Sequence, residues 1–185
     1  DVSKLDTSNV TNMSEMFRDC RGIKQLDVSK FDTSNVTNMK ALFYSCSKLE
    51  QLDLSNFNTS KVQDMSFMFH DCDSLKNVDV SKFDTSNVTS VESMFGYCKN
   101  LEQLDLSNFN TSKIKKINHM FQYCSGLKEL DLRNFSLAAV EDVRCMFMGC
   151  KKLQFMNLSF DRFIGNQIVV FDPYLYKSLP TVIIT

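Results

Sequence analysis

Hydrophobic and polar positions follow one another along this chain in a pattern that returns every 26 residues. In the unit spanning residues 26–51, Leu26 and Val28 alternate with polar residues, which is the period of a half-buried strand. Residues 32–35 are Asp, Thr, Ser and Asn, whose side chains can bond their own backbone and favour a turn. Each unit is therefore expected to begin with a strand that ends in a polar turn.

After the turn, the spacing of the apolar residues changes. Met39, Leu42, Phe43 and Cys46 stand at positions i, i+3, i+4 and i+7, which is typical of the buried face of a short amphipathic helix. Asn38 precedes this stripe and is a good N-cap residue, so a helix is expected to begin near position 38 and at the equivalent position of other units. One unit thus consists of a strand, a polar turn, a short helix and a short loop.

Two columns of identical residues mark the period. The phenylalanine column contains Phe17, Phe43, Phe69, Phe95, Phe121 and Phe147, and the cysteine column contains Cys20, Cys46, Cys72, Cys98, Cys124 and Cys150. A fixed period of this length is typical of a solenoid, in which each repeat buries its apolar face against its neighbours. We expect a parallel β-sheet on one face, short helices on the opposite face, and burial of both columns.

The segment Leu49-Glu50-Gln51-Leu52-Asp53-Leu54 has the form Leu-x-x-Leu-x-Leu. With the longer pattern LDLSNFDTSNVTNMSxMFxxCxxL, the chain resembles the 26-residue leucine-rich repeats of bacterial-surface-protein-A-like (BspA-like) proteins. The resemblance implies an α/β, right-handed leucine-rich-repeat solenoid of six units over residues 1–159, with a C-terminal capping segment over residues 160–185. It also implies a cell-surface or secreted protein linked to adhesion. Because Asp1 lies within a repeat, a targeting segment is expected upstream in a longer protein.

Charged residues also form columns. The first alternates in sign, which relieves repulsion between stacked units: Lys24, Glu50, Lys76, Glu102 and Lys128. The second lies on the strand face and does not alternate: Asp27, Asp53, Asp79, Asp105 and Asp131. Carboxylates stacked about 5 Å apart repel unless they are paired or hydrogen-bonded. Either each carboxylate accepts hydrogen bonds from neighbouring Ser or backbone groups, or the column is a cation ladder or a track for a basic partner.

Composition and motifs exclude several classes of function. The chain has 185 residues, of which 43% are hydrophobic, and a net charge of −1, which suits one continuous core and argues against nucleic-acid binding. No apolar run approaches the roughly 20 residues that cross a bilayer, so no membrane insertion is expected. His70 and His119 lack ligand spacing, and the cysteines lack the Cys-x-x-Cys pairs of a zinc site. We therefore expect no catalytic residue, no metal and no cofactor. Cys145 lies outside the cysteine column and is expected to be more exposed.

The repeat decays after residue 130. Phe155 falls in a strand-face column that is otherwise polar, and short strands are expected at 168–171 and 182–184, where a cap would cover the open core. An identically repeated surface offers a ligand several equivalent registers, so a unique partner should bind the irregular end. The candidate partner-binding residues are Glu129, Arg133, Phe155, Asp161 and Arg162. The alternative is that Phe155 is buried beneath the cap.

Three functions are compatible with these observations. The first is a non-enzymatic, adhesin-like interaction module, at the cell surface or secreted, whose strand face binds a protein or glycan of a host or cell envelope. The second is a structural spacer that binds nothing itself. The third is that a threonine column orders water or ice. That column contains Thr7, Thr33, Thr59, Thr85 and Thr111.

Overall fold

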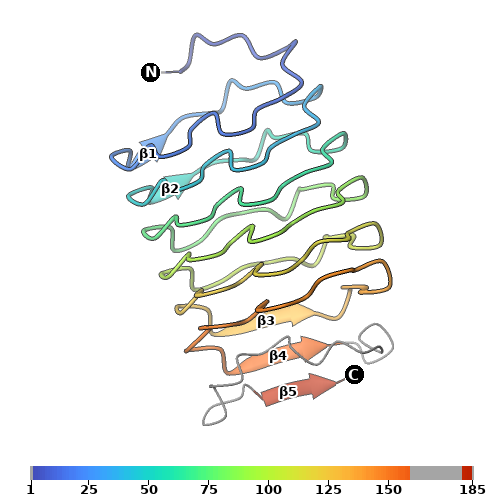
Figure 1. Ribbon diagram of the computed structural model, residues 1–185. Helices are drawn as coiled ribbons and strands as arrows, with labels where there is room; N and C mark the ends of the chain where they lie inside the picture. Colours follow the sequence, from blue (N-terminus) through green and yellow to red (C-terminus); the bar gives the residue numbers. More distant parts are fainter. Residues whose placement is uncertain (1, 159–180, 185) are drawn as a thin grey trace.

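The computed structural model describes residues 2–158 and 181–184. The chain winds repeatedly along the same path, so that successive 26-residue units lie on one another as a stack of layers (Figure 1). Isolated parallel bridges join Asn12 to Asn38 and Asn38 to Asp64, and they continue with the same step as far as Asp142. The sequence repeat is therefore a repeat in space, with each residue beside its equivalent in the next layer.

Within residues 2–158 and 181–184, the structure has five short strands, all paired in parallel (Figure 1). β1 (Gln25–Leu26) pairs with β2 (Gln51–Leu52). β3 (Glu129–Leu132), β4 (Phe155–Leu158) and β5 (Thr181–Ile184) form a three-stranded sheet in that order. β5 confirms the strand expected at 182–184, whereas the strand expected at 168–171 lies outside the described residues.

The predicted fold class, an α/β right-handed leucine-rich-repeat solenoid, is wrong. No helix occurs among residues 2–158 and 181–184, so the expected row of short helices is absent from this part of the chain. The expected continuous parallel sheet is also not formed, because the strands belong to one sheet of two strands and one of three. What the structure has instead is a stack of layers built mainly from turns and extended segments.

The backbone hydrogen bonds of the expected helical segment explain this difference. In an α-helix each N–H donates to the carbonyl four residues earlier. Here the N–H groups of Ala41 and Phe43 donate to the carbonyls of Ser66 and Met68 in the next layer, at 2.8 and 2.9 Å. The Leu42 N–H between them donates to the Met39 carbonyl, three residues earlier, at 3.2 Å. Because every second N–H group of this segment bonds to the next layer, the segment cannot form the hydrogen bonds of an α-helix.

Two left-handed residues in each layer produce these turns. In the second layer they are Ala41 and Ser45, with φ of 55° and 56°. The equivalent positions in other layers hold Phe67 and Tyr123, and among these sites only Gly149 is a glycine. A left-handed non-glycine residue costs about 1–3 kcal/mol and persists only where its surroundings hold it. The hydrogen bonds between layers provide that restraint.

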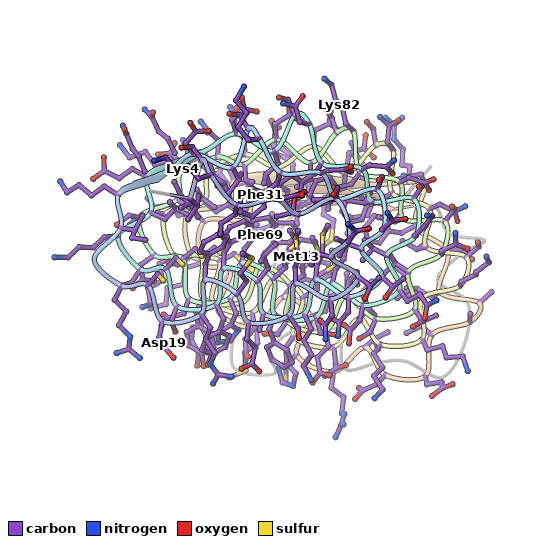
Figure 2. The ribbon with its side chains drawn as sticks, turned by 90° about the horizontal axis from the view of Figure 1, so that it is seen from above. Lys4, Met13, Asp19, Phe31, Phe69 and Lys82 are labelled. Atoms are coloured by element: carbon purple, nitrogen blue, oxygen red, sulfur yellow. The ribbon has the colours of Figure 1, made fainter. Side chains whose placement is uncertain are left out.

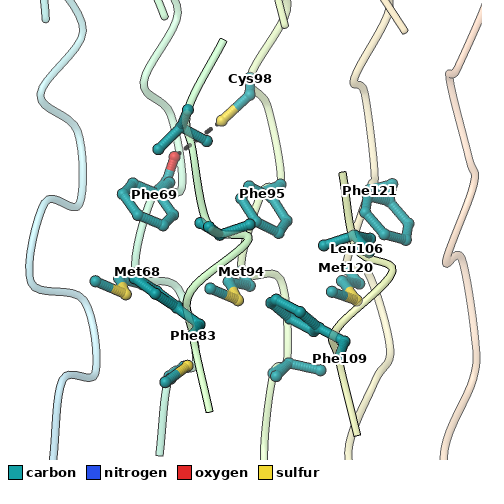
Figure 3. Close-up of a cluster of buried hydrophobic side chains, with 14 of the residues drawn as sticks. Met68, Phe69, Phe83, Met94, Phe95, Cys98, Leu106, Phe109, Met120 and Phe121 are labelled. Atoms are coloured by element: carbon teal, nitrogen blue, oxygen red, sulfur yellow. Dashed lines mark hydrogen bonds between the residues drawn. The ribbon is translucent and has the colours of Figure 1, made fainter. Parts of the chain in front are cut away.

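The apolar columns nevertheless face the interior, as the sequence predicts. Figure 2 looks along the stack and shows Met13 and Phe69 within the winding chain, whereas Lys82 projects outward. All six residues of the phenylalanine column are buried, with exposed fractions of 0–6%. The rings of Phe69 and Phe95 stack with centroids 5.5 Å apart and planes 8° apart (Figure 3). The cysteine column is also buried except at Cys20 in the first layer, where the prediction of burial is wrong.

The threonine column is buried as well, with exposed fractions of 1–3%. The Thr85 hydroxyl donates to the Asn110 carbonyl at 3.1 Å and accepts a hydrogen bond from the Asn110 N–H at 2.7 Å. Thr33 and Asn58 repeat this pair at 3.0 and 2.7 Å. These hydroxyls link layers and do not face solvent, which argues against the water- or ice-ordering hypothesis.

The alternating charge column forms ion pairs between layers. Lys24 Nζ lies 3.5 Å from Glu50 Oε1, and Lys128 Nζ lies 3.1 Å from Glu102 Oε2. Their side chains are exposed, and such pairs contribute about 0–1 kcal/mol each. The alternation therefore removes repulsion more than it adds stability.

Candidate binding site

The strand face consists of the outward-pointing residues of the strands and of their equivalent segments in the other layers. In β3, Glu129 and Asp131 are exposed, whereas Leu130 and Leu132 between them are buried. This alternation follows from the period of two in an extended chain, which places successive side chains on opposite faces. The aspartate column therefore lies on the strand face, as the sequence predicts.

The carboxylates of the aspartate column accept hydrogen bonds from the residue two positions later. Asp27 Oδ1 accepts one from the Ser29 N–H at 3.0 Å, and Asp79 Oδ1 accepts two from Ser81, at 2.9 Å from N and 2.6 Å from Oγ. These bonds hold the pKa of Asp79 below its usual value, so the group is ionised at neutral pH. The structure thus shows the first alternative, in which each carboxylate accepts hydrogen bonds from neighbouring Ser or backbone groups. The other two alternatives, a cation ladder and a track for a basic partner, stay predictions.

A groove of about 450 Å³ lies at the C-terminal end of the strand face. Its polar and aromatic lining comes from Gln103, Asp105, Glu129, Asp131, Phe155 and Asn157. In the register of the sheet, Glu129 lies opposite Phe155 and Asp131 lies opposite Asn157. Parallel pairing of β3 and β4 therefore brings two of the predicted partner-binding residues, Glu129 and Phe155, side by side.

Phe155 is half exposed, with an exposed fraction of 50%. It begins β4, and its neighbour Met156 is buried. The alternative that Phe155 is buried under a cap is therefore wrong. A large aromatic side chain left in solvent beside polar groups is a feature of protein interfaces.

Arg133, another of the predicted partner-binding residues, is paired with a carboxylate of the aspartate column. Its Nε donates to both carboxylate oxygens of Asp131, at 2.9 and 3.0 Å. The hydrogen bond from Arg133 is also the main reason that the pKa of Asp131 lies below its usual value. Arg133 is thus already paired within its own layer. The two remaining candidates, Asp161 and Arg162, lie outside the described residues.

Asp105 is a member of this site that sequence reasoning placed only in the repeated column. Hydrogen bonding by Ser107 lowers the pKa of Asp105, while the negative charges of Asp79 and Asp131 raise it. Within residues 2–158 and 181–184, neither Asp105 nor Glu129 forms an ion pair. Asp131 is paired with Arg133, but Asp105 and Glu129 give the groove negative charge that no ion pair offsets within the described structure.

Two further kinds of site can be examined among the described residues: a metal site and a reactive cysteine. In the described part of the chain, no group of three or more His, Cys, Asp or Glu residues is placed to hold a metal ion. The Cys98 thiol donates to the Phe69 carbonyl at 3.0 Å (Figure 3), and burial raises the pKa of Cys98. Because the thiolate is the reactive form, such a cysteine is inert.

The seven cysteines should therefore fall into two classes of reactivity. We expect the partly exposed Cys20 and Cys145 to react with Ellman's reagent in the native protein, and the five buried cysteines to react only after unfolding. The measurement is the amount of thionitrobenzoate released before and after denaturant is added. Cys145→Ser should remove one fast-reacting equivalent. Fast reaction of more than two thiols in the native state would contradict the observed burial.

The stacked layers and their columns of equivalent residues define the chain as a repeat protein. A family model described as "Mycoplasma protein of unknown function, DUF285" matches residues 1–78 and 69–162. These matches span most of the chain, which therefore belongs to this family. A comparison with curated proteins finds no match. Over residues 2–158 and 181–184, the structure contains no helix that is long and apolar enough to cross a membrane.

Proposed function

We propose that this chain is a non-enzymatic interaction module that binds a macromolecule through its strand face. The observation that carries the proposal is the half-exposed Phe155 in the groove at the end of that face. Removing apolar surface from water contributes about 25 cal/mol per Å². A complex in which the partner covers this ring is therefore stabilised. An aromatic side chain surrounded by polar groups is typical of the residues that contribute most to binding at protein interfaces.

We further propose that the module is displayed at a cell surface or secreted. This step is supported by the resemblance of the 26-residue repeats to those of bacterial-surface-protein-A-like proteins, which are linked to adhesion. The pattern that carries the resemblance includes Leu49-Glu50-Gln51-Leu52-Asp53-Leu54. The location would be tested by labelling intact cells with an antibody raised against this chain.

A structural spacer is the second candidate function. It is favoured by the hydrogen bonds within the aspartate column, because the repeated carboxylates are already bonded to their own neighbours Ser29, Ser55, Ser81 and Ser107. A surface whose polar groups are satisfied in this way can remain in solvent without a partner. The two candidates differ in whether Phe155 has a partner to contact.

Substitution of Phe155 tests the proposed function. Against a panel of host matrix proteins, envelope proteins and glycans, the module should bind a partner, and Phe155→Ala should weaken that binding about tenfold because the aromatic contact is lost. The matched control is Asp53→Asn, which alters the regular part of the same face and should change the affinity less than about twofold. Surface plasmon resonance supplies both values. Equal losses would assign binding to the repeated face, and no binding to any member of the panel would favour the spacer.

A further inference from the structure

We infer that the groove binds a basic segment of a partner protein, with a lysine or arginine side chain lying against Phe155. The charged end of that side chain would lie between the carboxylates of Asp105 and Glu129. This inference rests on the proposed function of the strand face and adds the chemical class of the partner.

The geometry of the groove supplies an aromatic ring and carboxylates on one surface. Phe155 and Glu129 are opposite each other in the register of β3 and β4, and neighbouring parallel strands lie about 4.8 Å apart. Asp105 lies 26 positions before Asp131, which places it in the preceding layer of the same groove. A cation within about 6 Å of an aromatic ring is attracted to the ring face. One ligand side chain can therefore contact the ring and reach a carboxylate.

The charge distribution along the strand face distinguishes this groove from the rest of the aspartate column. The positive charge of Lys30 acts on Asp27, and that of Lys82 acts on Asp53 and Asp79. The position equivalent to Lys82 in the next layer is occupied by the neutral Asn108. At the groove, Arg133 pairs with Asp131, whereas Asp105 and Glu129 form no ion pair within residues 2–158 and 181–184. A positively charged partner is therefore complementary to Asp105 and Glu129.

A neutral ligand would fit this surface less well. Covering the carboxylates of Asp105 and Glu129 removes them from water, and an unpaired carboxylate out of water is costly. A cationic ligand replaces the lost hydration with an ion pair. Complementary charge is therefore needed for any partner that covers Phe155 closely.

A side chain fits better than a metal ion. The carboxylate of Asp131 is bonded to Arg133, and no group of three or more His, Cys, Asp or Glu residues in the described structure is placed for a metal. Phe155 also offers a metal ion no ligand atom, whereas Mg²⁺ and Ca²⁺ require several oxygens. Lysine and arginine combine an apolar stem with a charged end, which matches a ring beside carboxylates.

Labelled peptides test the inference directly. Fluorescein-labelled Gly-Ser peptides that contain three lysines, three arginines, three glutamates or three norleucines would be titrated with the intact chain and followed by fluorescence anisotropy. We expect the lysine and arginine peptides to bind, and the glutamate and norleucine peptides to bind at least about tenfold more weakly, because only the basic peptides complement the groove. Equal binding of the norleucine peptide would overturn the requirement for charge.

Single substitutions locate the contact. Phe155→Ala, Asp105→Asn and Glu129→Gln should each weaken binding of the lysine peptide about fivefold or more. Asp27→Asn is the matched control at the other end of the column and should change the affinity less than about twofold. Arg133→Ala should strengthen binding about twofold or more, because it releases the Asp131 carboxylate that Arg133 now occupies. The thermal midpoint of each variant would confirm that the fold is retained.

The outcomes separate this inference from the proposed function. Equal losses for Asp27→Asn and Asp105→Asn would show that charge acts along the whole column, which overturns a specific groove. If the basic peptides do not bind while another partner still depends on Phe155, the inference fails and the proposed function stands. If no partner and no peptide depends on Phe155, both fail.

Discussion

Replacing Phe95 with alanine is expected to lower the free energy of unfolding by about 3–5 kcal/mol. Phe95 has an exposed fraction of 0%, and its ring stacks between those of Phe69 and Phe121, with centroids 5.5 and 6.0 Å away (Figure 3). Truncation would leave a cavity in the middle of the stack, because the layers on either side are held by their own hydrogen bonds and cannot collapse into it. The measurement is equilibrium unfolding in guanidinium chloride.

Phe155→Ala is the matched control for this effect. The same substitution at a half-exposed position should cost no more than about 1 kcal/mol, since little buried volume is lost. The two variants therefore separate the structural phenylalanines from the one assigned to binding. Similar losses of stability for both variants would contradict the difference in burial.

Replacing Thr85 with valine is expected to cost about 2–3 kcal/mol. Valine has nearly the shape of threonine, so the change removes the hydroxyl and creates no cavity. The hydroxyl both donates to the carbonyl of Asn110 and accepts from its N–H, at 3.1 and 2.7 Å. Both backbone groups would lose their partner next to a side chain that is 1% exposed. Chemical denaturation measures the loss.

Thr89→Val provides the comparison within the same layer. Thr89 is exposed, and its hydroxyl donates to the Gln63 carbonyl at 3.2 Å. Water can replace that hydrogen bond, so the expected cost is below about 0.5 kcal/mol. If the two valine variants lost the same stability, the buried threonine column would not be holding layers together.

The candidate site was predictable in part. Glu129 and Phe155 could be found from the sequence because they break a regular pattern, and a break in a repeat is visible without coordinates. The pairing of Arg133 with Asp131 could not be predicted, because these hydrogen bonds depend on how the chain turns after β3. The position of Asp105 in the groove could not be predicted either. In sequence it is one of five equivalent aspartates, and only the groove distinguishes it.

The pattern of apolar and polar residues is enough to predict which side chains lie inside and which residues stack on one another. Met39, Leu42 and Phe43 are all buried, as their spacing predicts, because burial of apolar surface dominates the energetics of each layer. The 26-residue period likewise predicts the pairing of Lys24 with Glu50 across one layer step.

The backbone conformation of those same segments depends instead on contacts between layers. The spacing i, i+3, i+4 and i+7 indicates which residues face inward, but it does not specify which carbonyl accepts the hydrogen bond of each N–H group. In the stack, the N–H groups of Ala41 and Phe43 bond to the next layer, and Ala41 adopts a left-handed conformation that its residue type does not favour. Hydrogen bonds between layers therefore override the local preference for a helix, and those partners lie 25 residues away in the sequence.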